Sequence, residues 1–465
     1  MSSRPAPVTA VSAPGKVLLT GGYLVLDRAY SGTVFALDAR IHVVVQQLQR
    51  EPSEDHEERV VVRSPQFRGA VWEYGIRRCE SGGGVQVTQR NDGPKNPFVE
   101  TSLNYALTYI SYVADSQDIG SLSVTILADN DYYSDPGQAT DQRREKSQFR
   151  DFGVTLQEAH KTGLGSSAAL VTALVSALVV HRTMHPDDLI IARPKLHNLA
   201  QAAHCAAQGK IGSGFDVAAA VYGSCFYRRF SPTVLERVGE VGSPGFDERL
   251  FSTVEDLDRE HPWDAECVDV GIKLPPGVQM VLCDVDCGSE TPSMVRKVLE
   301  WRKQNRAEAD ALWNELQSNN DKLRYELRRL HHHHHRRRDP DEEAAARETI
   351  RELLGRARRL LRSMTEKSGV PIEPRVQTEL LDRVSELDGV IGGVVPGAGG
   401  YDAVALLVRD EPRVYKQLEE FLSGYQSTVE DDFGGRIERV RMLGVRQGPE
   451  GVRVERDLER YVAWL

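Results

Sequence analysis

Four glycine-containing segments combine the residue types that bind phosphate groups: APGK at residues 13–16, GLGSSA at 163–168, GKIGSGFD at 209–216 and PGAGGYD at 396–402. Glycine turns bring backbone N–H groups close to an anion, and a lysine such as Lys16 adds positive charge. Serine hydroxyls can be ligands of a Mg²⁺ ion that bridges phosphates, and a carboxylate such as Asp216 can pair with a lysine. Together these groups indicate chemistry on a phosphorylated substrate.

The segment at 163–168 admits two interpretations. The apolar residues 168–180 that follow it predict a helix, so the loop lies at the positive end of the helix dipole. In the first interpretation the loop wraps phosphates and Ser166 or Ser167 holds Mg²⁺. In the second, one of these serines only caps a core helix.

Two other nucleotide-binding patterns are disfavoured. The loop formally fits G-x-G-x-x-A, but Asp187 and Asp188 precede apolar residues instead of ending a second strand, as a dinucleotide site requires. No G-x-x-x-x-G-K-[ST] phosphate loop surrounds Lys16 or Lys210.

The remaining segments also have ordinary structural explanations. Asp216 precedes the small residues 217–220, so we expect it to be partly buried beside a partner such as a lysine. Asp216 could instead be only a helix N-cap. Lys16 could be an ordinary exposed lysine, and residues 396–402 could be an ordinary hairpin turn. Each segment alone is ambiguous, and their order along the chain is the specific signal.

The elements that must position these groups alternate between strand-like and helical patterns. Strand-like runs dominate residues 11–48, helical spacing appears at 99–113 and 196–208, and residues 390–408 are typical of strand, turn, strand. The mixture predicts an α+β fold. We place one domain at 1–230 and another at 231–465, the latter with a charged helical insertion around 302–362.

Composition excludes several classes of protein. The 465 residues include 58 basic and 68 acidic side chains, a net charge of −10 without a dominant basic block, which argues against a nucleic-acid binder. Six scattered cysteines indicate a reducing compartment and no zinc site. The first residues lack a signal peptide, and the apolar stretch 168–180, interrupted by Thr172 and Ser176, is at 13 residues too short to span a bilayer. We therefore expect a cytoplasmic protein without membrane insertion.

One low-complexity segment is set apart from these motifs. Five histidines at 331–335 precede three arginines at 336–338. Such a run could bind metal, but we interpret it as a solvated loop between helices.

The sequence resembles the galactose–homoserine–mevalonate–phosphomevalonate (GHMP) kinase superfamily. APGKVLLTGGYLVL, KTGLGSSAALVTALV and VVPGAGGYDAVALLV match its three signature motifs in the family's order. AQGKIGSGFDVAAAVYGS, GSETPSMVRKVLEW and NPFVETSLNYAL are similar to the phosphomevalonate kinases of the fungal type. The resemblance implies an N-terminal domain like ribosomal protein S5 domain 2 and a ferredoxin-like C-terminal domain.

The resemblance also implies an activity and a set of site residues. The reaction would transfer the γ-phosphoryl group of ATP to (R)-5-phosphomevalonate, in the mevalonate pathway of isoprenoid and sterol biosynthesis. Asp216 would be the catalytic aspartate and Lys16 its partner, with ATP and Mg²⁺ as cofactors and Ser167 and Ser166 as metal ligands. The implied nucleotide-binding residues are Lys161, Thr162, Gly163, Leu164, Gly165, Ser166, Ser167, Ala168 and Asn96. The implied acceptor-binding residues are Lys210, Ser213, Tyr23, Ser289, Thr291, Gly397, Gly399 and Gly400, with Arg296 and Lys297 as weaker candidates.

Some expectations stay open at this point. Mevalonate kinases hold the metal with a glutamate upstream of the aspartate, and residues 204–208 contain none. The competing functions are mevalonate kinase or another small-molecule kinase of this superfamily, a non-catalytic regulator of the same fold and, more distantly, a dinucleotide oxidoreductase. We expect only small-molecule partners and a monomer or weak homodimer.

Overall fold

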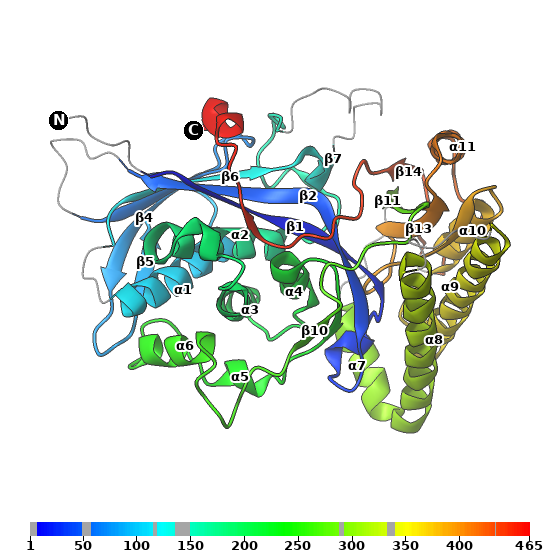
Figure 1. Ribbon diagram of the computed structural model, residues 1–465, viewed down its shortest axis with the longest axis horizontal. Helices are drawn as coiled ribbons and strands as arrows, with labels where there is room; N and C mark the ends of the chain where they lie inside the picture. Colours follow the sequence, from blue (N-terminus) through cyan, green and yellow to red (C-terminus); the bar gives the residue numbers. More distant parts are fainter. Residues whose placement is uncertain are drawn as a thin grey trace.

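A long antiparallel pair, β1 (Thr9–Thr20) and β2 (Gly32–Gln47), forms the spine of the first part of the molecule (Figure 1). The structure, a computed structural model, describes residues 7–48, 57–114, 119–134, 149–287, 293–332, 340–432 and 434–465. The sheet runs in the order β10-β9-β2-β6-β3-β4-β5, and β1 lies on β2 off this path. The other strands are β3 (Arg59–Arg63), β4 (Val71–Arg78), β5 (Val85–Gln89), β6 (Leu122–Ala128), β9 (Cys225–Arg228) and β10 (Glu266–Val268), beside a short ribbon of β7 (Tyr133–Ser134) and β8 (His160–Lys161).

Helices cover one face of this sheet (Figure 1). They are α1 (Pro97–Ala114), α2 (Ser166–Thr183), α3 (Arg193–Gln208), α4 (Phe215–Tyr222), the short α5 (Thr233–Glu236) and α6 (Phe246–Val254). Among the described helices, α2 alone is long and apolar enough to cross a membrane, but 67% of it is buried inside the fold. It packs against β1, α1 and α3, which confirms that the apolar run 168–180 is a core helix.

The second part of the molecule is built on a four-stranded antiparallel sheet. Its strands β11 (Val278–Asp286), β12 (Val390–Val394), β13 (Ala403–Arg409) and β14 (Arg439–Met442) lie in the order β12-β13-β11-β14. Helices connect β11 to β12, and α11 (Pro412–Ser423) connects β13 to β14. This strand order and connectivity are those of a ferredoxin-like fold, as expected.

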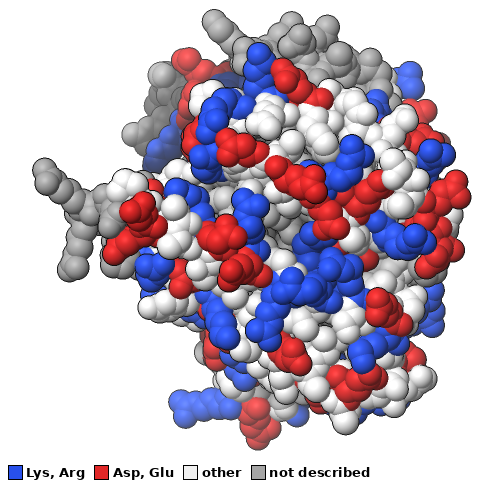
Figure 2. Space-filling view, turned by 90° about the vertical axis from the view of Figure 1, so that its right-hand side faces the viewer, with Lys and Arg blue, Asp and Glu red and all other residues white. Residues whose placement is uncertain are grey.

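Three charged helices, followed by α10 (Arg375–Ser385), make up the first of these connections. They are α7 (Met294–Gln304), α8 (Arg306–His332) and α9 (Pro340–Ser368), and α8 packs along α9. Their apolar stripes are buried, whereas their outer faces carry charge. Acidic and basic side chains are interspersed over the face that this part of the molecule presents (Figure 2). The helical insertion was predicted from its charge pattern; residues 333–338 of the histidine–arginine run lie outside the described residues.

The packing divides the chain differently from the expected boundary at residue 230. Beyond it, β10 pairs with β9, and α6 packs against α1 and α3. Near the other end of the chain, β15 (Arg453–Val454) pairs with β1. Residues 231–268 and 446–461 therefore lie with the first sheet, because that sheet offers them strand edges and an apolar surface.

Residues 446–461, here called the returning segment, run closely over the first sheet. Gly448 N–H donates to Ala36 O (2.9 Å), and Glu455 N–H donates to Ala10 O (2.8 Å). Tyr461 is buried, and its hydroxyl lies 2.8 Å from His42 Nδ1. The returning segment thus completes both the hydrogen bonding and the apolar cover of β1.

Candidate active site

Lys16 lies on β1 where that strand touches the 163–168 loop. Its backbone N–H donates to Leu164 O at 3.0 Å. A Cβ on Gly15 would lie 2.7 Å from both the Leu164 carbonyl oxygen and the Tyr132 hydroxyl. Only glycine at position 15 therefore lets the strand and the loop come this close.

The loop itself ends at an uncapped helix N-terminus. Gly163 and Gly165 have φ angles of 75° and 78°, in the left-handed region that favours glycine. Gly165 is the N-cap residue of α2, and no side chain accepts a hydrogen bond from the first turn at this position. The interpretation of Ser166 or Ser167 as an N-cap is therefore wrong, and the N-cap residue leaves the N–H groups of this turn without a side-chain partner.

Asp216 lies in the first turn of α4, two residues after the N-cap Gly214, which has a left-handed φ of 79°. Its Oδ1 accepts a hydrogen bond from Val217 N–H (2.9 Å), and its side chain is 22% exposed. Burial, the largest effect, lowers the pKa of Lys16, and the Asp216 carboxylate acts in the opposite direction. The Asp216 carboxylate thus lies near enough to act on the charge of Lys16, and a direct pairing of the two side chains stays a prediction.

His204 lies between Ser167 and Asp216, and nothing in the sequence motifs predicted a role for it. His204 on α3 is buried, and its Nε2 lies 3.1 Å from Ser167 Oγ and 4.0 Å from Asp216 Oδ2. Burial lowers the pKa of His204, which favours the neutral imidazole. The signal that could have revealed it is a polar stripe along a buried helix, formed by His197, Gln201, His204 and Gln208.

The stripe also positions the turn before Asp216. Gln201 Nε2 donates to Gly214 O at 2.8 Å and lies 3.1 Å from His197 Nε2. A Cβ on Gly214 would come within 2.9 Å of the Gln201 amide. The start of α4 is therefore held directly against α3.

The loop between β12 and β13 brings the second part of the molecule to the same strand. Gly397 N–H donates to Leu18 O (3.1 Å), and the Tyr23 hydroxyl donates to Ala398 O (2.5 Å). A Cβ on Gly22 would overlap the Gly397 carbonyl oxygen. The 396–402 segment connects two paired strands, which agrees with its interpretation as a hairpin turn. It also contacts β1 at Leu18, two residues after Lys16.

Comparison with known proteins decides the family. Family models for the GHMP kinases N terminal domain and the GHMP kinases C terminal region match residues 146–224 and 343–425. The phosphomevalonate kinase of Aspergillus fumigatus is 66% identical over 99% of both chains, and that of Gibberella zeae is 46% identical over 99% of both chains.

The chain belongs to the phosphomevalonate kinase family. It is thus an ATP-dependent phosphotransferase of the GHMP superfamily, which confirms the resemblance carried by its glycine-rich motifs. A Streptococcus pneumoniae phosphomevalonate kinase, solved in complex with phosphomevalonate and AMPPNP, has the same fold. It superposes with a TM-score of 0.58 at 16% identity, over 93% of this chain and 99% of its own.

For a phosphomevalonate kinase, the predicted nucleotide residues separate into two groups. The first group forms the loop and the start of α2 beside Lys16: Gly163, Leu164, Gly165, Ser166, Ser167 and the buried Ala168. Within it, Leu164 and Gly165 lie against Lys16, and Ser167 contacts His204. The second group has structural partners of its own. The Thr162 hydroxyl donates to Asp131 O at 2.7 Å, and Asn96 Oδ1 accepts from Val99 N–H at 3.2 Å in the first turn of α1. Lys161 is exposed on β8.

The predicted acceptor residues separate in the same way. Lys210 and Ser213 lie on the turn before Asp216; Lys210 is exposed, and Ser213 O accepts from the Tyr227 hydroxyl at 2.6 Å. A Cβ on Gly397 would have no atom within 4 Å. Gly399 and Gly400 pack against Ile372, where a Cβ on Gly399 would overlap the carbonyl oxygen. Ser289 and Thr291 lie outside the described residues.

Proposed function

We propose that this chain transfers the γ-phosphoryl group of ATP to the phosphate of (R)-5-phosphomevalonate, giving 5-diphosphomevalonate and ADP. The observation that carries the proposal is the meeting of Lys16, the 163–168 loop and Asp216 at one place. Similarity to curated phosphomevalonate kinases over the whole length of the chain supports this choice of acceptor.

In this proposal the residues position anions and neutralise charge. The loop N–H groups and the N-terminus of α2 bind the ATP phosphates. The acceptor's phosphate has a second pKa of ~6 and is largely ionised near neutral pH, so a strong general base is not needed. An acceptor oxygen attacks the γ-phosphorus while the bond to the bridging oxygen of ADP breaks. Asp216 orients the acceptor and Lys16 stabilises the charge on the transferring group.

The oxygen donors near the loop fit Mg²⁺. The hydroxyls of Ser166 and Ser167 are hard ligands, and the described residues contain no cluster of three His, Cys, Asp or Glu side chains suited to a metal. A small set of protein ligands is typical of Mg²⁺, which takes its other oxygens from substrate phosphates and water. We therefore assign Ser167 and Ser166 as its ligands, with His204 holding the Ser167 hydroxyl. When bound, Mg²⁺ would neutralise phosphate charge.

A coupled ADP-release assay with mevalonate and phosphomevalonate side by side tests the acceptor. We expect turnover with phosphomevalonate and little or none with mevalonate. Preference for mevalonate would identify a sister kinase instead. Absence of turnover with either acceptor, in protein that still binds ATP, would indicate a regulator of the same fold.

Gly165→Ala is expected to weaken ATP binding by about tenfold or more, because a Cβ there would lie 2.7 Å from Lys16 Cε. Gly163→Ala is the matched control: φ is also positive, but no atom lies within 4 Å of its Cβ position. Calorimetric titration with AMPPNP compares the two. Equal losses would show that backbone strain, rather than contact with Lys16, determines the affinity.

We further propose a cytoplasmic location. All six cysteines are free thiols, which supports a reducing compartment. A monomer or weak homodimer stays a prediction, which light scattering would check.

A further inference from the structure

Arg229 is a partly buried guanidinium beside the turn that leads to Asp216. Its Nε and one terminal nitrogen donate to Gly212 O (3.1 and 2.8 Å), and the same nitrogen donates to Ile211 O (3.0 Å). The other terminal nitrogen donates to Leu26 O (2.8 Å). All of these acceptors are backbone carbonyl oxygens. Among the described residues, no carboxylate lies within ion-pair distance of Arg229.

A charge held in this way is solvated but not neutralised. An arginine side chain stays protonated at neutral pH even when burial lowers its pKa, as it does here. Asp27, whose charge acts on Arg229, is already paired with Arg302 at 2.8 Å. The positive charge is therefore available to any anion bound at the 209–214 turn.

Lys210 adds a second cation to the same turn. Its side chain is exposed and has no ion-pair partner within the part of the chain that the structure describes. A carboxylate and a phosphate on one acceptor require two or more cationic partners. Arg229 and Lys210 together meet that requirement beside Asp216.

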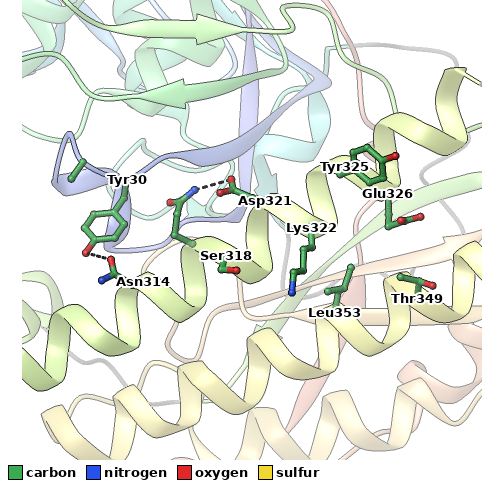
Figure 3. A pocket seen from close by; sticks show the side chains of 11 residues that line it. Tyr30, Asn314, Ser318, Asp321, Lys322, Tyr325, Glu326, Thr349 and Leu353 are labelled. Atoms are coloured by element: carbon green, nitrogen blue, oxygen red, sulfur yellow. Dashed lines mark hydrogen bonds between the residues drawn. The ribbon is translucent and has the colours of Figure 1, made fainter.

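The Arg229 guanidinium also links the 209–214 turn to the β1–β2 connection (residues 21–31). This connection is anchored at both ends. At one end Tyr23 donates to Ala398 O, next to Gly397. At the other end the Tyr30 hydroxyl donates to Asn314 Oδ1 of α8 at 2.9 Å, beside a cavity of about 670 Å³ (Figure 3). The turn is thus fixed to a segment that contacts the second part of the molecule twice.

We propose that Arg229 is a positioning residue for the acceptor, fixing the Lys210 turn and supplying uncompensated positive charge to it. The inference rests on the proposed function, and it predicts different effects on the binding of the two anionic substrates. ATP binds in that proposal at the 163–168 loop, whereas Arg229 acts on the 209–214 turn. Loss of Arg229 therefore affects the acceptor more than the nucleotide.

The test uses Arg229→Gln and Arg229→Lys in the full-length enzyme, with KM for each substrate and kcat/KM for phosphomevalonate measured at low and high ionic strength. In Arg229→Gln we expect kcat/KM for the acceptor to fall about 10- to 100-fold and to lose much of its salt dependence. KM for ATP should stay near that of the wild type. Arg229→Lys should restore the salt dependence but not the full rate, because one ammonium cannot bridge the three carbonyl groups.

Arg228→Gln is the matched control. Arg228 precedes Arg229 in the chain, but it pairs with Glu266 at 3.3 Å and donates to Arg28 O, so wild-type kinetics are expected. Unchanged acceptor kinetics in Arg229→Gln, or an equal rise in KM for ATP, would overturn the inference. If Arg229→Gln does not fold, wild-type kinetics in Arg229→Lys would overturn it equally. An inactive wild-type enzyme would instead count against the proposed function.

Discussion

Asp216→Asn is expected to lower kcat by about 10³-fold, while the variant folds normally and binds ATP at least as tightly as the wild type. The amide oxygen can still accept from Val217 N–H, so the first turn of α4 keeps the bond that the carboxylate makes there. What disappears is the negative charge that acts on Lys16 and that, in the proposed function, orients the acceptor. Loss of a carboxylate near bound phosphates removes a repulsion, which is why ATP affinity should not fall.

Single-turnover rates and calorimetric ATP titration together measure this effect. Asp188→Asn is the control, since Asp188 is an exposed aspartate on the short 3-10 helix after α2 and no role in the site is proposed for it. Its kinetics should match the wild type. Near-wild-type turnover in Asp216→Asn would rule out the role assigned to Asp216.

Lys16→Met is expected to lower kcat by about 10²- to 10³-fold and to raise the melting temperature slightly. Methionine matches the length and packing of the lysine stem, but it lacks the charge that the reaction needs. Burial already lowers the pKa of Lys16, so the buried ammonium reduces the free energy of unfolding of the protein. Removing that ammonium should stabilise the fold and inactivate the enzyme in the same variant.

Two further variants sharpen this prediction. Lys16→Arg should not recover activity, because the lysine stem fits closely against Gly165. The double variant Lys16→Met/Asp216→Asn should lose little more than the worse single variant, since the two groups act on one another. Calorimetric melting and steady-state kinetics check both. Full activity in Lys16→Arg, or additive losses in the double variant, would contradict the coupling.

The sequence predicted the parts of the site that depend on local backbone. Gly165 before Ser166 marks the start of α2, and Gly214 before Phe215 marks the start of α4, because each glycine takes a left-handed φ that ends the preceding turn. Such positions are visible as glycine patterns in any single sequence. The ferredoxin-like part followed from the family resemblance, and its strand order agrees.

What sequence reasoning missed depends on contacts between distant segments. His204 contacts the site because α3 lies beside both Ser167 and Asp216. Arg229 contacts it because the end of β9 lies against the 209–214 turn and the β1–β2 connection. Asn96 has a structural role that the sequence did not reveal: its oxygen accepts from Val99 N–H in the first turn of α1. Its predicted part in nucleotide binding stays a prediction. The returning segment was missed because β15 is only two residues long and carries no strand pattern.

That segment has a consequence for how the protein is made. Ser12 of β1 pairs with Arg453 of β15, about 440 residues further along the chain. Ribosomes add ~5–20 residues per second, so this edge of β1 waits on the order of a minute for its partner. During that interval the nascent chain exposes an unpaired strand edge, a known template for misassociation. Chaperone dependence should therefore be greatest before residues 446–461 leave the ribosome.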